Sequence, residues 1–388
     1  MLRRLLTTGA VGGALALTVT GCPVEPGGPT TTTSTTTTTT TPVGTPTYTV
    51  STVLSGLSNP WEVRFTPDGT LLFNERAGRI NAVVGGAQRV LAAPSDVVVA
   101  SEGGLLGLAV DPGFATNRRI YACFLSNISG SLDERVVRFE VNADYTALGG
   151  RTDIVTGIPL NNSGQTGRHS GCRLAFGPDA NLWVTTGDGA RSDTAQNPAS
   201  LGAKVLRVTT DGVAPAGNPG GALDPRIYTL GHRNAQGITF RPTSGQAFSV
   251  EQGTNCDDEV NVLVPGGNYG WNPGALGFYN EFAPMTDTFS VPGARSAAWS
   301  SGCPTIATSG GSFITGAQWG SWNGALVAGA LAGNQLRVLT FDAANALVSQ
   351  ATTLTDRGRI RTVTQGPDGN LYVATDSGSG SILKLTPS

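Results

Sequence analysis

The chain has 388 residues, of which 54 are glycine, and its 25 Lys and Arg side chains nearly balance 27 Asp and Glu, giving a formal net charge of −2. Because no basic stripe is present, the composition argues against nucleic acid as a partner. The length is sufficient for one large domain or two ordinary ones besides the terminal segments.

The N-terminus has the features of an export signal. A pair of arginines precedes an apolar run from Ala10 to Val19, which is too short to span a membrane as a mature helix. Small residues then precede Cys22, as in a bacterial lipoprotein cleavage site. We therefore expect residues 1–21 to be a signal peptide and Cys22 to be the lipid-anchored N-terminus of an exported protein, periplasmic or on the cell surface. The alternative is an ordinary secretory signal in which Cys22 occurs by chance.

The next segment, residues 22–47, consists mostly of Thr, Pro and Gly. Such a composition cannot bury a hydrophobic core, so we expect a disordered linker. The remaining residues, 48–388, form the predicted folded domain. The membrane is expected to be contacted only through the lipid on Cys22.

Short apolar runs bounded by Gly, Pro, Asn and Asp recur through the domain, whereas helical periodicity is almost absent. A tight turn followed by an apolar strand occurs six times. These six phrases begin at Thr66, Asp111, Gly177, Arg241, Trp322 and Gly366. Radial repetition buries the strands of an all-β chain and leaves only short edges, so we predict a six-bladed β-propeller of four-stranded antiparallel sheets. The alternative is a large β-sandwich or a β-helix.

Four cysteines remain after Cys22. An even number in an exported protein favours two disulfides, for which three pairings exist. We expect Cys123 to pair with Cys172 and Cys256 with Cys303, because each pair falls in neighbouring repeat units. The alternative is that all four are buried thiols.

The two histidines of the chain, His169 and His232, both lie in polar loops bordered by glycine. Histidine is the usual proton acceptor near neutral pH, although a single loop histidine is more often structural. No metal-ligand spacing surrounds either of them, so a zinc site is not predicted. Asp188 follows His169 just past a strand end, and Arg233 directly follows His232. The nearby carboxylate and guanidinium favour a catalytic role for these histidine loops.

Carboxylates, amides and carbonyls gather among glycines in two segments, Val250 to Glu259 and Gly266 to Trp271. Oxygen ligands on such turns suit calcium, although their spacing is not that of an EF-hand. The alternative is a solvated turn.

Several phrases, taken in order, resemble those of the soluble aldose sugar (glucose/sorbosone) dehydrogenases. They are Glu102-Gly-Gly-Leu-Leu-Gly-Leu-Ala109, His169-Ser-Gly-Cys-Arg-Leu-Ala-Phe-Gly-Pro-Asp179, Leu201-Gly-Ala-Lys-Val-Leu-Arg207, Tyr228-Thr-Leu-Gly-His-Arg-Asn-Ala-Gln-Gly237, Glu251-Gln-Gly253, Asp257-Asp-Glu-Val-Asn261, Asn268-Tyr-Gly-Trp271 and Arg359-Ile-Arg361 with the Gln-Gly-Pro-Asp-Gly that follows it. The resemblance runs from about Val53 to Pro387. It implies a six-bladed propeller that holds pyrroloquinoline quinone (PQQ) and Ca²⁺, oxidises the C1 hydroxyl of an aldose to a lactone, and passes electrons to an external acceptor.

The resemblance also implies roles for individual residues. His169 matches the general base, Asp188 the carboxylate that supports it, and Arg233 a cofactor-binding cation that stabilises charge on the quinone oxygen. The other matches to cofactor-binding positions are Glu102, Asn234, Gln252, Asp258, Arg359 and Arg361. The matches to calcium ligands are Gly253 and Thr254 through their carbonyls, with Glu259 and Tyr269 at a second, more structural position.

Simpler interpretations remain for some of these residues. Arg359 and Arg361 could lie on the exposed face of a strand, and Tyr269 and Trp271 could be packing aromatics.

The sequence departs from the family pattern at Ala332, which stands where many relatives have a lysine that contacts the cofactor. The loss of one charge-assisted contact costs roughly 1.5 to 3 kcal/mol, or about tenfold or more in affinity. Residues 190–196 also differ from the family pattern. Besides the dehydrogenase, two alternatives therefore stay open: a sugar- or glycan-binding propeller without turnover, and a calcium-dependent lactonase on the same fold.

Overall fold

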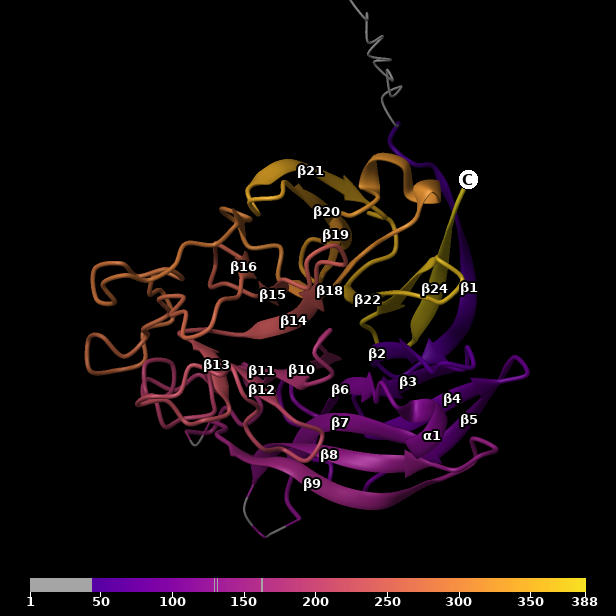
Figure 1. Cartoon of the computed structure of the whole chain (residues 1–388), viewed down its shortest axis with the longest axis horizontal. Helices are drawn as coiled ribbons and strands as arrows, with labels where there is room; N and C mark the ends of the chain where they lie inside the picture. The colour runs from indigo at the N-terminus through magenta and orange to yellow at the C-terminus, as the bar shows by residue number, and fades with distance from the viewer. Residues whose placement is uncertain (1–43, 129, 131, 162) are drawn as a thin grey trace, which may run out of the picture. The chain divides into compact units, whose positions relative to one another are not determined.

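The computed structural model describes residues 44–128, 130, 132–161 and 163–388. In this part of the chain, six four-stranded antiparallel sheets are arranged as blades around a common centre (Figure 1). The predicted six-bladed β-propeller is therefore confirmed. The expected signal peptide, Cys22 and most of the expected linker lie outside the described residues. No helix in the described ranges is long and apolar enough to span a membrane.

The first five blades each use four consecutive strands, which are paired in chain order. These strands are β2 (Pro60–Phe65), β3 (Leu71–Glu75), β4 (Arg79–Val84) and β5 (Ala87–Ala92) in the first blade; β6 (Leu105–Val110), β7 (Arg119–Ser126), β8 (Asp133–Val141) and β9 (Leu148–Ile158) in the second; β10 (Gly171–Phe176), β11 (Leu182–Thr186), β12 (Lys204–Val208) and β13 (Ile227–Leu230) in the third; β14 (Ala235–Phe240), β15 (Ala247–Glu251), β16 (Glu259–Val262) and β17 (Trp299–Ser300) in the fourth; and β18 (Thr308–Phe313), β19 (Leu326–Ala330), β20 (Gln335–Phe341) and β21 (Leu347–Thr353) in the fifth. The helices among the described residues are α1 (Phe114–Asn117) and the 3₁₀ helix η1 (Ala317–Trp322).

The sixth blade closes the ring by combining both ends of the domain. It contains β22 (Ile360–Gln365), β23 (Leu371–Thr375), β24 (Gly380–Pro387) and, as its outer strand, β1 (Tyr48–Leu57). Tyr48 is opposite Pro387 in this antiparallel pair. Joining the first strand to the last removes the open edge that a linear row of blades would leave.

The innermost strand of each blade contacts the innermost strands of its two neighbours, so β2, β6, β10, β14, β18 and β22 form the wall of the central region (Figure 1). Each of the six turn-strand phrases in the sequence connects the first strand of a blade to the second. In two of these turns, Gly69 (φ 84°) and Gly369 (φ 76°) have a backbone conformation that favours glycine. The repeat in the sequence therefore corresponds to the turn between the first and second strands, which recurs at the same end of every blade.

The hydrophobic core is divided among the interfaces between neighbouring blades. Leu72 of the first blade packs in one cluster with Phe124 of the second. Phe248 and Phe313 meet edge to face between the fourth and fifth blades, with ring centroids 5.1 Å apart. Each blade is therefore stabilised by burying both of its faces against its neighbours.

Arg173, on β10, crosses the central region and connects four blades. Its guanidinium forms a buried ion pair with Glu62 of the first blade and donates to the carbonyl of Gln236 (2.8 Å) in the fourth and of Arg361 (3.2 Å) in the sixth. It also lies 3.9 Å from the centre of the Trp61 ring. Burial lowers the pKa of Arg173 to about 10, so the guanidinium remains charged at neutral pH.

The structure confirms both predicted disulfides, Cys123–Cys172 and Cys256–Cys303. The first connects β7 of the second blade to β10 of the third. The second connects the loop after β15 to the loop before β18. Each closes a loop of nearly 50 residues, which lowers the entropy of the unfolded chain.

Candidate active site

The predicted site residues share one end of the blades. His169 lies two residues before β10 begins and Asp188 two residues after β11 ends. Because β10 and β11 are antiparallel, with Gly171 opposite Thr186, these two positions meet at the same rim. In every blade, the start of the innermost strand and the end of the second strand lie at this rim. The other predicted residues near such strand ends are Glu102, Arg233, Asn234, Gln252, Asp258 and Arg359.

His169 and Asp188 form a buried pair. The Nδ1 atom of His169 lies 2.8 Å from Oδ1 of Asp188, and the two residues are 5% and 0% exposed. Their loops approach so closely that a β-carbon on Gly187 would lie 1.6 Å from the carbonyl oxygen of His169, so only glycine fits. The Nε2 atom of His169 has no hydrogen-bond partner among the described residues. It is the ring nitrogen available to accept a proton from a ligand.

Arg233 lies beside this pair, since its carbonyl accepts a hydrogen bond from the backbone N–H of Asp188 (2.8 Å). Its Nη1 donates to the carbonyl of Gly253 (2.6 Å), and its Nη2 pairs with the carboxylate of Glu281. Burial would lower the pKa of Arg233, but the charges of Asp188 and Glu281 outweigh it and raise the pKa above its ordinary value. Arg233 is therefore a permanent cation, and its buried Nε has no acceptor in the part of the chain that the structure describes.

Glu102 connects the base to the predicted cofactor residues. Its carboxylate accepts hydrogen bonds from the backbone N–H of His169, from Asn234 Nδ2 (3.1 Å) and from Gln236 Nε2 (3.2 Å). Gln236 in turn accepts from Nη1 of Arg361 at 2.6 Å. One hydrogen-bond network thus joins four blades at the rim.

The two predicted arginines of the sixth blade share one carboxylate, that of Asp376. Arg361 is buried and lies 2.7 Å from it, whereas the half-exposed Arg359 lies 3.4 Å away. Burial would raise the pKa of Asp376, but the arginines and a hydrogen bond from Asn59 outweigh it and lower the pKa. Two cations and one anion leave a net positive charge here. Arg361 Nε is buried, and none of the described residues offers it an acceptor.

The predicted ligands of the first calcium lie on the turn after β15. The carbonyl of Gly253 accepts from Arg233, and a β-carbon on Gly253 would lie 2.3 Å from the carbonyl oxygens of both Cys256 and Asp257. The turn is therefore folded tightly enough to gather backbone oxygens around Gly253. Thr254, next in the chain, is half-buried.

Two predicted cofactor contacts nearby have different surroundings. The carboxylate of Asp258 is fully buried and accepts from the N–H of Gly253 (3.0 Å), the hydroxyl of Thr305 (2.8 Å) and the N–H of Ile306 (2.7 Å). Its oxygens thus hold the protein's own loops together. Gln252 donates its backbone N–H to the carbonyl of Asn234 (3.0 Å), which places it at the rim.

The predicted ligands of the second calcium, Glu259 and Tyr269, are both buried but are not hydrogen-bonded to one another. Burial and the nearby Glu251 carboxylate raise the pKa of Glu259 to about 8. The hydroxyl of Tyr269 donates to the carbonyl of Val262 (2.6 Å). Across the described residues, no three His, Cys, Asp or Glu side chains form a cluster that could hold a metal ion by side chains alone.

The side chain of His232, the other histidine, contacts other residues of the protein through both ring nitrogens and through its ring face. Its Nδ1 lies 2.8 Å from Glu251, its Nε2 lies 2.9 Å from the hydroxyl of Thr229, and its ring stacks on Tyr269. Both ring nitrogens are therefore occupied, unlike those of His169.

Three site residues were missed by sequence reasoning as functional positions: Gln236, Tyr279 and Glu281. The Tyr279 hydroxyl lies 3.2 Å from Nδ1 of His169, and Glu281 pairs with both Arg233 and Arg168. Tyr279 and Glu281 come from the long connection between β16 and β17, which has no repeat pattern that could have identified them. Gln236 lies inside the phrase Tyr228 to Gly237, which resembles the family, so its position in that phrase could have marked it as a site residue.

The departure from the family pattern, Ala332, lies at the same rim, in the turn between β19 and β20. Its backbone N–H donates to the carbonyl of Ile306 (3.0 Å), and its methyl group offers no donor to a ligand.

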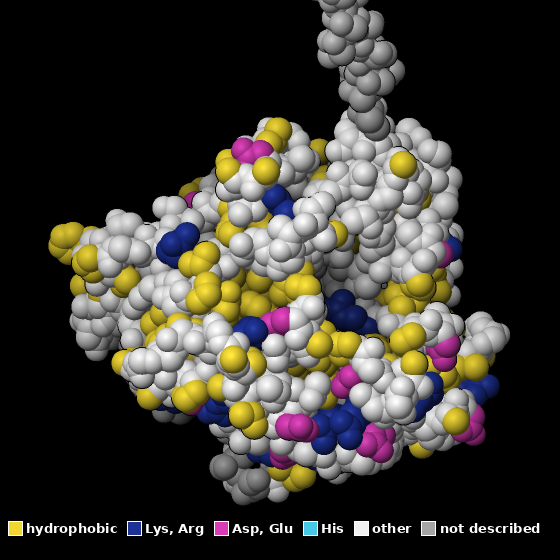
Figure 2. Space-filling model, in the orientation of Figure 1, with side chains coloured by type: hydrophobic (Ala, Val, Ile, Leu, Met, Phe, Trp, Pro, Cys, Tyr) yellow, Lys and Arg dark blue, Asp and Glu magenta, His cyan; other side chains and the backbone are white. Residues whose placement is uncertain are grey.

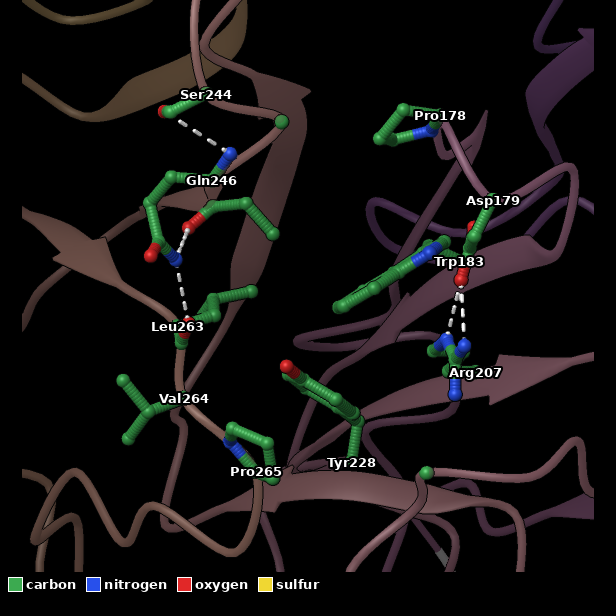
Figure 3. Close-up of a pocket in the computed structure, with 13 residues that line it drawn as sticks. Pro178, Asp179, Trp183, Arg207, Tyr228, Ser244, Gln246, Leu263, Val264 and Pro265 are labelled. Carbon is green, nitrogen blue, oxygen red and sulfur yellow. Dashed lines mark hydrogen bonds and ion pairs between the residues drawn. The ribbon is translucent and has the colours of Figure 1, made fainter.

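Two cavities lie near the third and fourth blades. One, of about 290 Å³, adjoins the base and is lined by Ser163, Ala190, Arg191, Ser192, Asp193 and Tyr279. The other, of about 370 Å³, lies at the opposite end of the strands, by the β10–β11 and β14–β15 turns. Figure 3 shows the Tyr228 ring in it, between the Asp179–Arg207 ion pair and the Val264–Pro265 turn. Figure 2 shows basic side chains in a recess at the centre of the ring.

Comparison with known proteins identifies the family. The glucose/sorbosone dehydrogenase family model matches residues 57–384. The aldose sugar dehydrogenase of Escherichia coli (strain K12) is 32% identical over 356 residues, covering 88% of this chain and 93% of that protein. Quinoprotein glucose dehydrogenase B of Acinetobacter calcoaceticus is 34% identical over 260 residues, covering 59% and 53%. The solved PQQ-bound aldose sugar dehydrogenase of Streptomyces coelicolor is 29% identical with a TM-score of 0.74, covering 89% of this chain and 100% of that one. The chain therefore belongs to the glucose/sorbosone dehydrogenase family of oxidoreductases.

Proposed function

We propose that this protein oxidises the C1 hydroxyl of aldose sugars to lactones, using PQQ and Ca²⁺. The observation that carries the proposal is the buried His169–Asp188 pair, in which Nε2 of His169 has no partner among the described residues and the Asp188 charge interacts with the cationic Arg233. This is the arrangement needed to remove a proton while negative charge is stabilised nearby. The PQQ-bound relative from Streptomyces coelicolor supports the choice of cofactor.

The donors at the rim fit an anionic, planar cofactor. The Nε atoms of Arg233 and Arg361 are buried donors without acceptors among the described residues, and Arg359 presents a half-exposed guanidinium. Planar guanidinium groups suit carboxylates, of which PQQ has three. We assign Glu102, Arg233, Asn234, Gln252, Arg359 and Arg361 to cofactor binding. Asp258 then acts by holding the turn of Gly253 rather than by contact.

In the proposed reaction, Nε2 of His169 accepts the proton of the C1 hydroxyl. Asp188 keeps the Nδ1–H tautomer and stabilises the imidazolium that forms. Arg233 stabilises the negative charge that develops during oxidation. Bound PQQ supplies the acceptor for the hydride that leaves C1, and an external acceptor later takes the two electrons.

For calcium, we assign the carbonyls of Gly253 and Thr254, supported by the tight oxygen-rich turn. The buried Glu259, together with Tyr269, forms the proposed second position. Polar side chains lining the cavity of about 290 Å³ beside Tyr279 suit sugar hydroxyls.

The proposed location is outside the cytoplasm, with a lipid anchor on Cys22. The two disulfides support export, because such bonds persist in oxidising compartments.

Reconstitution tests this proposal. We expect the protein, after incubation with PQQ and Ca²⁺, to reduce an electron-accepting dye when glucose or another aldose is added. Chelation of Ca²⁺ before reconstitution is expected to abolish the activity. Binding of PQQ without dye reduction by any aldose would instead indicate a sugar-binding propeller, and lactone hydrolysis without PQQ would indicate a lactonase.

A further inference from the structure

The Asp188 carboxylate, which has no solvent exposure, is surrounded by donors on both oxygens. Oδ1 accepts from the backbone N–H of Ala190 (2.6 Å) and lies 2.8 Å from His169 Nδ1. Oδ2 accepts from the indole Nε1–H of Trp271 (2.7 Å) and from the hydroxyl of Tyr279 (3.1 Å). One oxygen therefore faces the base, and the other is held by two donors, of which the Tyr279 hydroxyl also lies 3.2 Å from His169 Nδ1.

The two donors to Oδ2 come from another blade. His169 and Asp188 belong to loops of the third blade, whereas Trp271 and Tyr279 lie in the connection between β16 and β17 of the fourth. Trp271 is fully buried. It is more than a packing residue, because its indole N–H donates a hydrogen bond to Asp188. Burial and the nearby Asp188 charge raise the pKa of Tyr279 well above its ordinary value, so its hydroxyl remains a donor at all working pH values.

The orientation of the Asp188 carboxylate decides which nitrogen of His169 carries the proton. With Oδ1 turned toward Nδ1, the neutral ring keeps its proton there and presents a lone pair at Nε2. If Oδ2 lost its donors, the carboxylate could rotate, and the alternative tautomer with a proton on Nε2 would become populated. That tautomer cannot accept a proton at Nε2.

We propose that Trp271 and Tyr279 are positioning residues for the catalytic base, acting through Oδ2 of Asp188. This inference rests on the proposed role of His169. It assigns a function to the β16–β17 connection: the loop of the fourth blade completes the base of the third.

The cleanest variant is Tyr279→Phe, which removes one hydroxyl and keeps the ring. The double variant Tyr279→Phe/Trp271→Phe removes both donors to Oδ2. The matched control is Tyr228→Phe, which removes a hydroxyl in the cavity at the opposite end of the strands. Thermal unfolding of each variant reports whether it is folded.

The first readout is the nitrogen NMR spectrum of the cofactor-free protein at a pH where the rings are neutral. Only two histidines contribute, and His169→Asn assigns the signals. We expect the Nδ1–H tautomer of His169 in the wild type and in Tyr228→Phe, a populated Nε2–H tautomer in Tyr279→Phe, and more of it in the double variant. An unchanged tautomer in a folded double variant would overturn the proposal, whether or not the protein oxidises sugars.

The second readout is activity after reconstitution. A hydrogen bond to a charged group contributes about 1.5 kcal/mol or more, so kcat is expected to fall about tenfold in Tyr279→Phe with KM nearly unchanged. A rise in KM with constant kcat would show that Tyr279 only lines the sugar site, which would contradict the proposal. Absence of activity in the wild type would count against the proposed function alone, because the tautomer measurement remains valid.

Discussion

Replacing His169 with asparagine is expected to lower kcat by about 10²- to 10⁴-fold, the usual contribution of a general base. The variant removes the ring nitrogen of His169 that lacks a hydrogen-bond partner among the described residues, whereas both ring nitrogens of His232 are hydrogen-bonded. Asparagine is the suitable replacement because His169 has a φ of 51°, a backbone conformation that asparagine tolerates better than alanine. Steady-state dye reduction with a saturating aldose measures the effect.

The affinity for PQQ provides the control for this variant. His169 is assigned to proton transfer, so His169→Asn is expected to bind PQQ about as tightly as the wild type and to unfold at a similar temperature. A variant that binds PQQ and keeps more than a tenth of the wild-type kcat would show that the base lies elsewhere.

Replacing Lys204 with methionine is expected to lower the free energy of unfolding by about 3 kcal/mol. Lys204 is fully buried, and its Nζ donates to the carbonyls of Thr194 (2.8 Å), Ala195 (3.1 Å) and Gly202 (2.8 Å). These carbonyls belong to the loop between β11 and β12 that carries Asp188. Methionine fills the space but leaves the Gly202 carbonyl without a donor, and an unpaired buried group costs roughly 1 to 3 kcal/mol. The carbonyls of Thr194 and Ala195 lose one donor each and keep the backbone N–H groups of Asn197 and Gly231. Urea unfolding measures the loss.

The pH dependence of this loss has a definite sign. Burial lowers the pKa of Lys204 in the folded state to about 7, below its ordinary value of 10.5 in the unfolded chain. Between these two values the unfolded chain binds more protons, so the contribution of Lys204 to stability rises with pH, by up to about 1.4 kcal/mol per unit. The difference between wild type and Lys204→Met should therefore grow from pH 7 to pH 10.

The other lysine of the chain supplies the control. Lys384 is partly exposed and pairs with Asp368 at 2.8 Å, so Lys384→Met should cost less than about 1 kcal/mol. Equal losses in the two variants, or a Lys204→Met difference that shrinks as pH rises, would contradict the assigned role of the buried amine.

The fold was predictable from sequence because its signal is local and repeated. Each turn-strand phrase, such as the one starting at Gly177, connects two neighbouring strands of one blade, and six of them determine the number of blades. The disulfides followed from the same repeat, since neighbouring blades bring Cys123 and Cys172 together. The closure through β1 was not predicted, because the pairing of β1 with β24 joins distant parts of the chain.

The site was predicted only in part, for a physical reason. Residues in family phrases, such as His169, Asp188 and Arg233, lie at strand ends, and the fold brings them to one rim. Tyr279 and Glu281 reach the same place from an irregular connection, where side-chain identity carries no periodic signal. The orientation of Trp271 toward Asp188 depends on the packing between blades, and this packing is not encoded in any local pattern.

A single-turnover measurement tests the central claim most directly. Protein loaded with one equivalent of PQQ and with Ca²⁺ is mixed with glucose in the absence of oxygen and of any other acceptor, and the cofactor absorbance and the lactone are followed together. We predict one lactone for each quinone reduced, with the same amplitude but a far slower rate in His169→Asn. Oxidised cofactor that remains unchanged in the presence of every aldose tested would contradict the account.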